Sequence, residues 1–198
     1  MNVSPGRPRK QRIVFVIGIF ALVGLFCALG GRTKPHHIAT RTSPGFSQRQ
    51  KCDELVTAAG DGDMKTMKRL LDSGVSPNAD NGSDKQGDGI SALSNAASCG
   101  HLDAVQLLLD RGADVNADDF WGGNALVGAS LWGQVDVVKC LIAHGADPNM
   151  DDDGASALGY AAHQLVAPEN IAPAKNYVEI VRLLKSVGAK SANPFWPF

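Results

Sequence analysis

The sequence has 198 residues, of which 44% are hydrophobic and 20% are charged, a composition that is ordinary for a globular protein and leaves room for one or two small domains. Eight of the 19 basic residues precede Lys51 and all 20 acidic residues follow Gln50, so the part from Lys51 onward carries a net charge of −9. An acidic surface repels phosphate backbones, which argues against a nucleic-acid partner.

The N-terminal region consists of a basic segment, residues 1–12, and a run without charge, Ile13 to Gly31. A helix of that length spans about 28 Å, close to the thickness of a bilayer core. Basic residues before such a run favour a cytoplasmic N-terminus. We therefore expect a signal-anchor transmembrane helix at residues 13–31, in contact with the lipid bilayer, and a periplasmic or otherwise exported domain after it. The alternative is a cleaved signal peptide and a soluble exported domain, because small residues surround Leu29.

Residues 32–50 read RTKPHHIATRTSPGFSQRQ and show no hydrophobic periodicity. Two prolines, several hydroxyl residues and four bases indicate a flexible linker. As a random coil it would average about 24 Å from end to end, which would hold the following domain near the membrane without fixing its orientation.

From Cys52 onward the sequence repeats itself. One marker is a glycine followed four residues later by asparagine, and a second marker lies 12 residues before each such glycine. Between the two markers, apolar residues recur at helical spacing, and the closing glycine is typical of a helix end. The pattern predicts helices over residues 64–73, 102–111, 135–144 and 177–186. A third marker opens a shorter, alanine-rich helix with a polar N-cap residue at Ser91, Asn124 and Ser156.

These markers resemble ankyrin repeats, with their 33-residue period, T-P-L-H-x-A-A opening, G-H step and G-A-D-x-N ending. The resemblance covers about residues 52–193. It implies an all-α fold, an ankyrin-repeat α-solenoid of about four helix pairs over residues 51–193, preceded by the transmembrane helix. It also implies a role in recognising another protein. The opening departs from the family pattern, because the usual His is replaced by Ser94, Val127 and Gly159.

Three further departures concern the ends and loops. The first repeat lacks the family opening and reads CDELVTAAGDGD, which indicates a polar N-terminal cap. The connection between Asn78 and Ser91 is long and polar, which predicts a mobile finger. The fourth repeat carries about eleven extra residues between Ala162 and Asn176, with two prolines that exclude a continuous helix.

Large apolar side chains occupy positions where ankyrin repeats usually carry polar residues. Exposed clusters of Trp and Phe mark binding hot spots, and residues on the next first helix would extend the patch. The predicted partner-binding residues are Phe120, Trp121, Leu131, Trp132, Tyr160 and His163. The alternative is that the insertion of the next repeat folds over Trp132 and buries it. The aromatic tail, residues 194–198, is interpreted as a cap on the last repeat, or else as a short recognition peptide.

No catalytic motif is found: a nucleophile elbow, a P-loop, a dinucleotide-binding glycine motif, H-E-x-x-H and paired Cys-x-x-Cys are all missing. Cys140 and His144 have a spacing that zinc can use, and Asp151, Asp152 and Asp153 form an acidic finger, but neither is a specific metal signature. We therefore expect no enzyme, no cofactor and no metal. The function predicted is that of a membrane-tethered protein-binding scaffold. The alternative is a regulator or inhibitor that masks a periplasmic enzyme or toxin through an acidic repeat surface.

Overall fold

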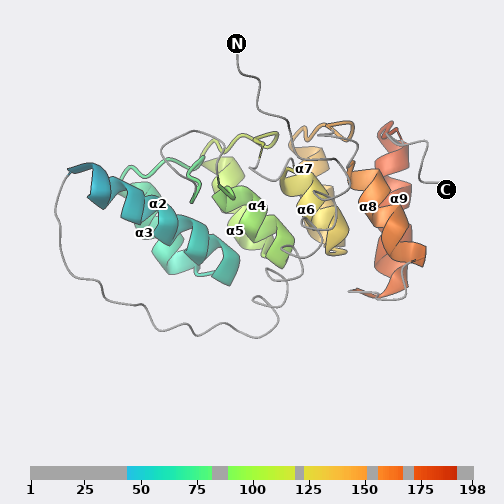
Figure 1. The fold of residues 1–198 in the computed structure, drawn as a ribbon, viewed down its shortest axis with the longest axis horizontal. Helices are drawn as coiled ribbons and strands as arrows, with labels where there is room; N and C mark the ends of the chain where they lie inside the picture. Colours follow the sequence, from blue (N-terminus) through green and yellow to red (C-terminus); the bar gives the residue numbers. More distant parts are fainter. Residues whose placement is uncertain (1–43, 82–88, 119–122, 151–155, 167–171, 191–198) are drawn as a thin grey trace, which may run out of the picture. The chain divides into compact units, whose positions relative to one another are not determined.

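The computed structural model describes residues 44–81, 89–118, 123–150, 156–166 and 172–190, all within one compact unit that starts at Ile38. These ranges contain eight helices in four consecutive pairs (Figure 1). Their bounds are α2 (Pro44–Asp61) with α3 (Met64–Asp72), α4 (Ala92–Cys99) with α5 (Leu102–Asp110), α6 (Ala125–Leu131) with α7 (Val135–Ala143), and α8 (Ala157–Val166) with α9 (Ala174–Ser186).

The pairs stack side by side in chain order. Each first helix contacts the next first helix, from α2 through α4 and α6 to α8, and each second helix contacts the next second helix, from α3 through α5 and α7 to α9. Leu70, Leu108, Leu141 and Leu184 recur at one register position of the second helices and are fully buried, which gives a continuous core. The all-helical solenoid predicted from the repeat pattern is confirmed for the described residues.

The predicted N-caps form. In each of the last three pairs the side chain before the first helix accepts a hydrogen bond from the backbone N–H three residues later, which satisfies one of the free donors at a helix start. The three bonds run from Ser94 to Ser91 at 3.0 Å, from Val127 to Asn124 at 2.9 Å and from Gly159 to Ser156 at 3.1 Å. Because these bonds use the backbone, they form even though the family His is replaced.

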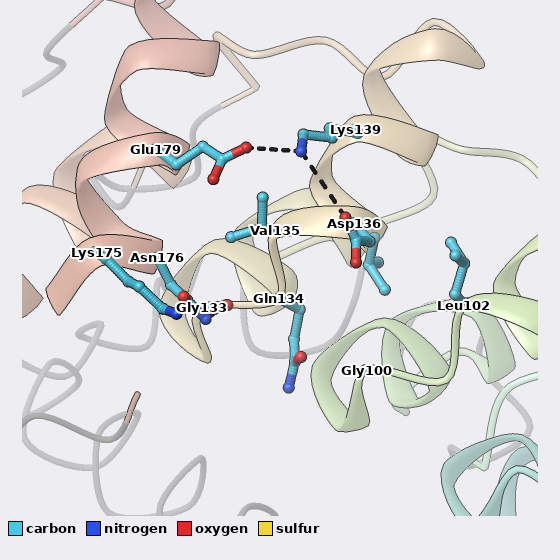
Figure 2. Close-up of a pocket in the computed structure, with 11 residues that line it drawn as sticks. Gly100, Leu102, Gly133, Gln134, Val135, Asp136, Lys139, Lys175, Asn176 and Glu179 are labelled. Atoms are coloured by element: carbon cyan, nitrogen blue, oxygen red, sulfur yellow. Dashed lines mark hydrogen bonds and ion pairs between the residues drawn. The ribbon is translucent and has the colours of Figure 1, made fainter. Parts of the chain in front are cut away.

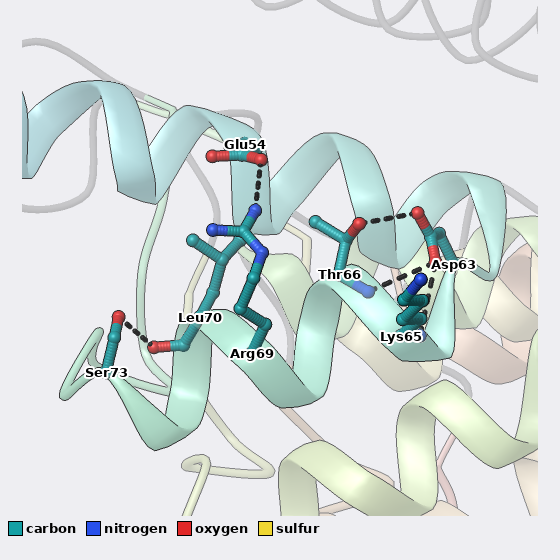
Figure 3. A network of polar contacts seen from close by, with 7 residues as sticks. All are labelled: Glu54, Asp63, Lys65, Thr66, Arg69, Leu70 and Ser73. Atoms are coloured by element: carbon teal, nitrogen blue, oxygen red, sulfur yellow. Dashed lines mark hydrogen bonds and ion pairs between the residues drawn. The ribbon is translucent and has the colours of Figure 1, made fainter.

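The first pair carries a polar network, as the interpretation of a cap requires (Figure 3). Asp63 caps α3 by accepting hydrogen bonds from the backbone N–H groups of Lys65 and Thr66, both at 3.1 Å, and from the Thr66 hydroxyl at 2.6 Å. Arg69 of α3 forms an ion pair with Glu54 of α2 at 2.6 Å. Exposed pairs of this kind contribute little stability, but they keep this end of the stack compatible with water.

Helix α2 corrects the predicted boundary of the linker. It begins at Pro44, so residues 44–50 are helical and not part of a flexible linker that reaches Gln50. The physical reason is local: proline is tolerated in the first turn of a helix, and the polar residues from Ser47 to Lys51 include good helix formers and no glycine or proline.

The insertion of the fourth repeat is partly helical. Helix α8 has ten residues where α6 has seven, and α9 has thirteen where α7 has nine. The prediction that the two prolines interrupt the helix is confirmed, because α8 ends at Val166 and α9 starts directly after Pro173. The earlier start of α9 also explains why Asn176 replaces glycine in the second marker: it lies inside a helix, whereas Gly100 and Gly133 have φ of +80° and +70°.

The predicted membrane anchor, residues 13–31, lies outside the described residues. Within the part of the chain that the structure describes, no helix has both the length and the apolar character that crossing a membrane requires.

Candidate protein-binding surface

The fingers between the helix pairs form one connected row, and asparagine makes the connections. The side-chain oxygen of Asn78 accepts a hydrogen bond from the backbone N–H of Asp114 at 2.7 Å. Asn116 does the same for Asp147 at 2.8 Å, and Asn149 does so for Lys190 at 2.8 Å. The asparagine that ends each repeat in the sequence is therefore the residue that holds the next finger in place, a role that the repeat pattern alone did not reveal.

Charge is divided between the fingers and the first helices. Helices α4, α6 and α8 contain no Asp, Glu, Lys or Arg. The fingers contain the exposed aspartates Asp114, Asp118 and Asp147. Two of these also shape their turns, because Asp114 accepts a hydrogen bond from the N–H of Asn116 at 2.9 Å and Asp147 accepts one from Asn149 at 2.8 Å. The surface thus combines uncharged helices with a negatively charged row of fingers.

The predicted partner-binding residues differ in how far they are exposed to solvent. Leu131 is only 5% exposed and belongs to the interior, so the expectation that its side chain is exposed to a partner is not met. Its register position is equivalent to that of Ser98, which is also buried, because neighbouring first helices approach closely there. Trp132, Tyr160 and His163 are half-buried and remain accessible. Phe120 and Trp121 lie outside the described residues.

Trp132 stands where the third and fourth pairs meet. The hydroxyl of Tyr177, from α9, donates a hydrogen bond to the carbonyl of Leu131 at 3.0 Å. Ala172, near the end of the insertion, would lie 2.6 Å from a Cβ added to Gly133. The insertion therefore contacts the residue after Trp132 and leaves the indole half-buried, an outcome between the two alternatives of exposure and complete burial. The indole Nε1 is inaccessible and has no hydrogen-bond partner.

Tyr160 lies on α8, in the fourth pair. Burial raises the pKa of its hydroxyl, so the group stays a neutral phenol at physiological pH. A half-buried phenol offers an apolar ring together with a hydrogen-bonding tip, a combination that is favoured in protein interfaces.

A polar cleft of about 440 Å³ lies on the second helices, at the start of α7 and α9 (Figure 2). Lys139 forms ion pairs with Glu179 at 2.6 Å and with Asp136 at 3.8 Å. The hydrogen bond to Glu179 raises the pKa of Lys139, so the amine stays protonated and is not available as a base or nucleophile. The sequence reasoning missed this cleft, and its only signal was the spacing of Asp136 and Lys139 on one helix face.

Cys140 and His144 lie close together at the end of α7, with the Cys140 Sγ 3.8 Å from the His144 Nδ1. The Nδ1–H of His144 donates a hydrogen bond to the carbonyl of Cys140 at 2.8 Å, which ties the ring to the end of α7. Burial raises the pKa of the Cys140 thiol, whereas zinc binds the thiolate. Across the described ranges, no group of three or more His, Cys, Asp and Glu side chains is arranged to hold a metal ion. Asp151, Asp152 and Asp153 lie outside those ranges.

Comparison with known proteins agrees with this architecture. Residues 37–119 and 55–152 each match a family model described as ankyrin repeats (3 copies), and together they cover more than half of the chain. No curated protein matches the sequence. The fourth helix pair lies beyond the matched residues, and it is the pair with the insertion and with Asn176 in place of glycine. The stacked helix pairs, the finger asparagines and the family match together place this chain in the ankyrin-repeat family.

Proposed function

We propose that this chain is a membrane-tethered scaffold that binds another protein through its fingers and first helices. Ankyrin repeats mediate binding to other proteins, and proteins built from them are typically scaffolds without enzymatic activity. The observation that carries the proposal is the connected row of fingers beside first helices without charge. A row fixed by hydrogen bonds from backbone N–H groups to asparagine side chains presents its other side chains at regular intervals, as recognition of a protein surface requires.

The partner surface centres on Trp132 and Tyr160. Both are half-buried aromatic residues at the ends or surface of first helices, and both can exclude water from a contact. His163 follows Tyr160 on α8. Phe120 and Trp121 belong to the finger that precedes α6 in the sequence, and we include them in the proposal on the basis of the sequence alone. A partner that matches this surface has an apolar contact region next to basic groups that face Asp114, Asp118 and Asp147.

The tether follows from the sequence of residues 13–31. A helix of 19 uncharged residues is long enough to cross a bilayer core. Confinement near the membrane would raise the effective concentration of the scaffold for a partner in the same membrane, so moderate affinity would suffice.

Crosslinking in intact cells tests the binding role. A photoreactive phenylalanine analogue replaces Tyr160, and crosslinked proteins are identified by mass spectrometry. The matched control carries the analogue at Lys139, in the polar cleft on the second helices. We expect one protein to be captured from Tyr160 and not from Lys139. Equal capture from both positions would contradict the proposal that the partner binds the first helices.

Once the partner is known, Trp132 tests the surface. Trp132→Ala should weaken the affinity at least about tenfold, as truncation of a hot-spot aromatic does. Trp132→Phe keeps one aromatic ring but loses the five-membered ring of the indole with its N–H, so it should retain more of the affinity than Trp132→Ala. Lys139→Ala serves as the control. An affinity unchanged by Trp132→Ala, with the fold intact by circular dichroism, would exclude Trp132 from the contact.

The tether is tested separately by membrane fractionation. The full chain should stay with membranes after alkaline carbonate extraction, and a variant without residues 13–31 should not. Release of the full chain by carbonate, together with the mass expected for cleavage near Gly30, would support the alternative of a cleaved signal peptide.

A second candidate function is inhibition of a basic target, supported by the exposed finger aspartates. Electrostatic steering speeds association and weakens as salt screens the charges. Asp118→Asn is the informative variant, because Asp114 and Asp147 also shape their turns. For an inhibitor of this kind, association should slow in Asp118→Asn and in high salt. For a scaffold that binds mainly through Trp132 and Tyr160, association should change little.

A further inference from the structure

When the second helices are aligned by their repeat pattern, one position of the alignment lies on the side of each pair that faces the following pair. Met67, Val105 and Val138 occupy this position in α3, α5 and α7, and all three are fully buried. Met67 belongs to the first pair, so its burial comes from its own pair and the following one. Val181 is the equivalent residue in α9, and it is only partly buried.

The first helices show the same change at the last pair. Ala59, Ala97 and Ser130 occupy equivalent positions in α2, α4 and α6, and each is fully buried. Ala162 takes this position in α8 and is half-buried. The last pair therefore has an open side made of the same small and apolar residues that meet a neighbouring pair elsewhere in the stack.

The exposed apolar residues gather at this end. Val166 of α8 is 55% exposed and Val178 of α9 is 46% exposed, whereas Leu102 and Val135, at the position of Val178 in other pairs, are half-buried. At the opposite end of the stack, Arg69 occupies the position of Leu107 and Cys140 and pairs with Glu54. A terminal repeat needs a polar outer face or a cover, and the last pair has no such polar replacement at Val178 and Val181.

We propose that residues 191–198 of the same chain cover this side of α8 and α9. This segment reads SANPFWPF and combines three aromatic residues with no charge. It follows Lys190, whose backbone N–H is held by Asn149 at 2.8 Å, so it starts from a fixed point next to the end of α9. Eight extended residues reach about 26 Å, and α9 with its thirteen residues is about 20 Å long, so the aromatic side chains can reach Val181 and Val178.

A double-mutant cycle in the full chain, kept in solution with a mild detergent, tests the contact. The cycle combines removal of residues 194–198 with Val181→Ser. We expect the removal to lower Tm by about 3 °C or more, and to speed amide hydrogen exchange in α9. Val181→Ser should lower Tm clearly in the intact chain and at most half as much in the shortened one, because its contact has already been removed.

Val187→Ser is the matched control. Val187 is 42% exposed, but Arg111 and His144 at the same position are exposed in the inner pairs, so no cover is needed there. This variant should change Tm little, and equally in both chains.

Three results would overturn the proposal. The first is an unchanged Tm and unchanged exchange in α9 after the removal. In that case, weaker partner capture after the removal would identify the segment as a recognition peptide. Dissociation of a dimer by Val181→Ser, seen in light scattering, would identify a second copy of the chain as the cover. The second is a lowered Tm with strictly additive effects, which would place the segment elsewhere on the domain. The third is an equal response of Val187→Ser and Val181→Ser to the removal.

Discussion

The side-chain amide of Asn116 makes two hydrogen bonds with the next finger: its oxygen accepts from the backbone N–H of Asp147 at 2.8 Å, and its nitrogen donates to the carbonyl of Gly145 at 3.4 Å. Asn149 repeats both bonds with Lys190 and Gly188, at 2.8 and 3.4 Å. One residue type therefore joins consecutive fingers, because its short amide offers both a donor and an acceptor at that point.

Replacement of Asn116 by Ala should destabilise the repeat domain by about 1 kcal/mol, the usual net contribution of a hydrogen bond, because the finger is exposed and water can replace part of the loss. Asn116→Asp keeps an acceptor for Asp147 and should lose less. Urea unfolding measures both, with Gln106→Ala on the exposed side of α5 as control. A loss for Asn116→Ala no larger than for the control would show that the finger asparagines do not stabilise the stack.

Gly128 lies inside α6, where Ala would normally raise helix stability by about 1 kcal/mol. A Cβ at this position would collide with the Ser98 hydroxyl of α4, which is buried. Gly128→Ala should therefore destabilise the wild-type chain. In a Ser98→Ala background the collision disappears, because the Ser98 Cβ would be 3.7 Å away, and the same substitution should become neutral or stabilising. The absence of this change in sign in thermal unfolding would contradict the close approach of α4 and α6.

Leu131→Ala should cost about 2–5 kcal/mol, since it removes a buried side chain and leaves a cavity between α6 and its neighbours. Lys68→Ala, at an exposed side chain of α3, should cost less than about 0.5 kcal/mol. Urea denaturation separates the two. A small effect of Leu131→Ala would mean that the residue is accessible and would return it to the partner-binding surface.

Asp63 gives the domain a pH dependence in the acid range. The hydrogen bonds from Thr66 and Lys65 hold the pKa of Asp63 below its ordinary value of 3.8. Because the folded pKa is the lower one, the stabilisation is fully present above pH 3.8 and is lost as the pH falls through the folded pKa. Asp63→Asn keeps a good N-cap, so it should change stability little at pH 7 but should weaken its pH dependence below 3.8.

Thr66→Ala is the partner variant for this prediction. It removes the hydroxyl that donates to Asp63 at 2.6 Å, so the pKa of Asp63 should move back toward its ordinary value in an NMR titration. If the titration of Asp63 were the same with and without Thr66, the assigned cause of the shift would be incorrect.

Some features of this protein are determined by the sequence itself. The helix pairs, the N-caps at Ser91, Asn124 and Ser156, and the interruption of the fourth repeat by proline were all predicted from the sequence and are present. These features depend on backbone geometry over a few residues, and the same residue types recur at the same positions of several repeats.

Tertiary structure decided which side chains reach the surface. Leu131 and Trp132 are adjacent in the sequence and both were expected to face a partner, yet one is interior and the other half-buried, because the close approach of α6 to its neighbours differs between the two positions. It also decided that the finger asparagines bind across repeats and that Val181 is open where Val138 is buried. Whether a side chain is buried depends on the residues that pack against it. In a stacked repeat these residues belong to a neighbouring unit some 30 to 40 residues away in the sequence. The asparagine bonds, for example, join residues that are 31 and 36 positions apart.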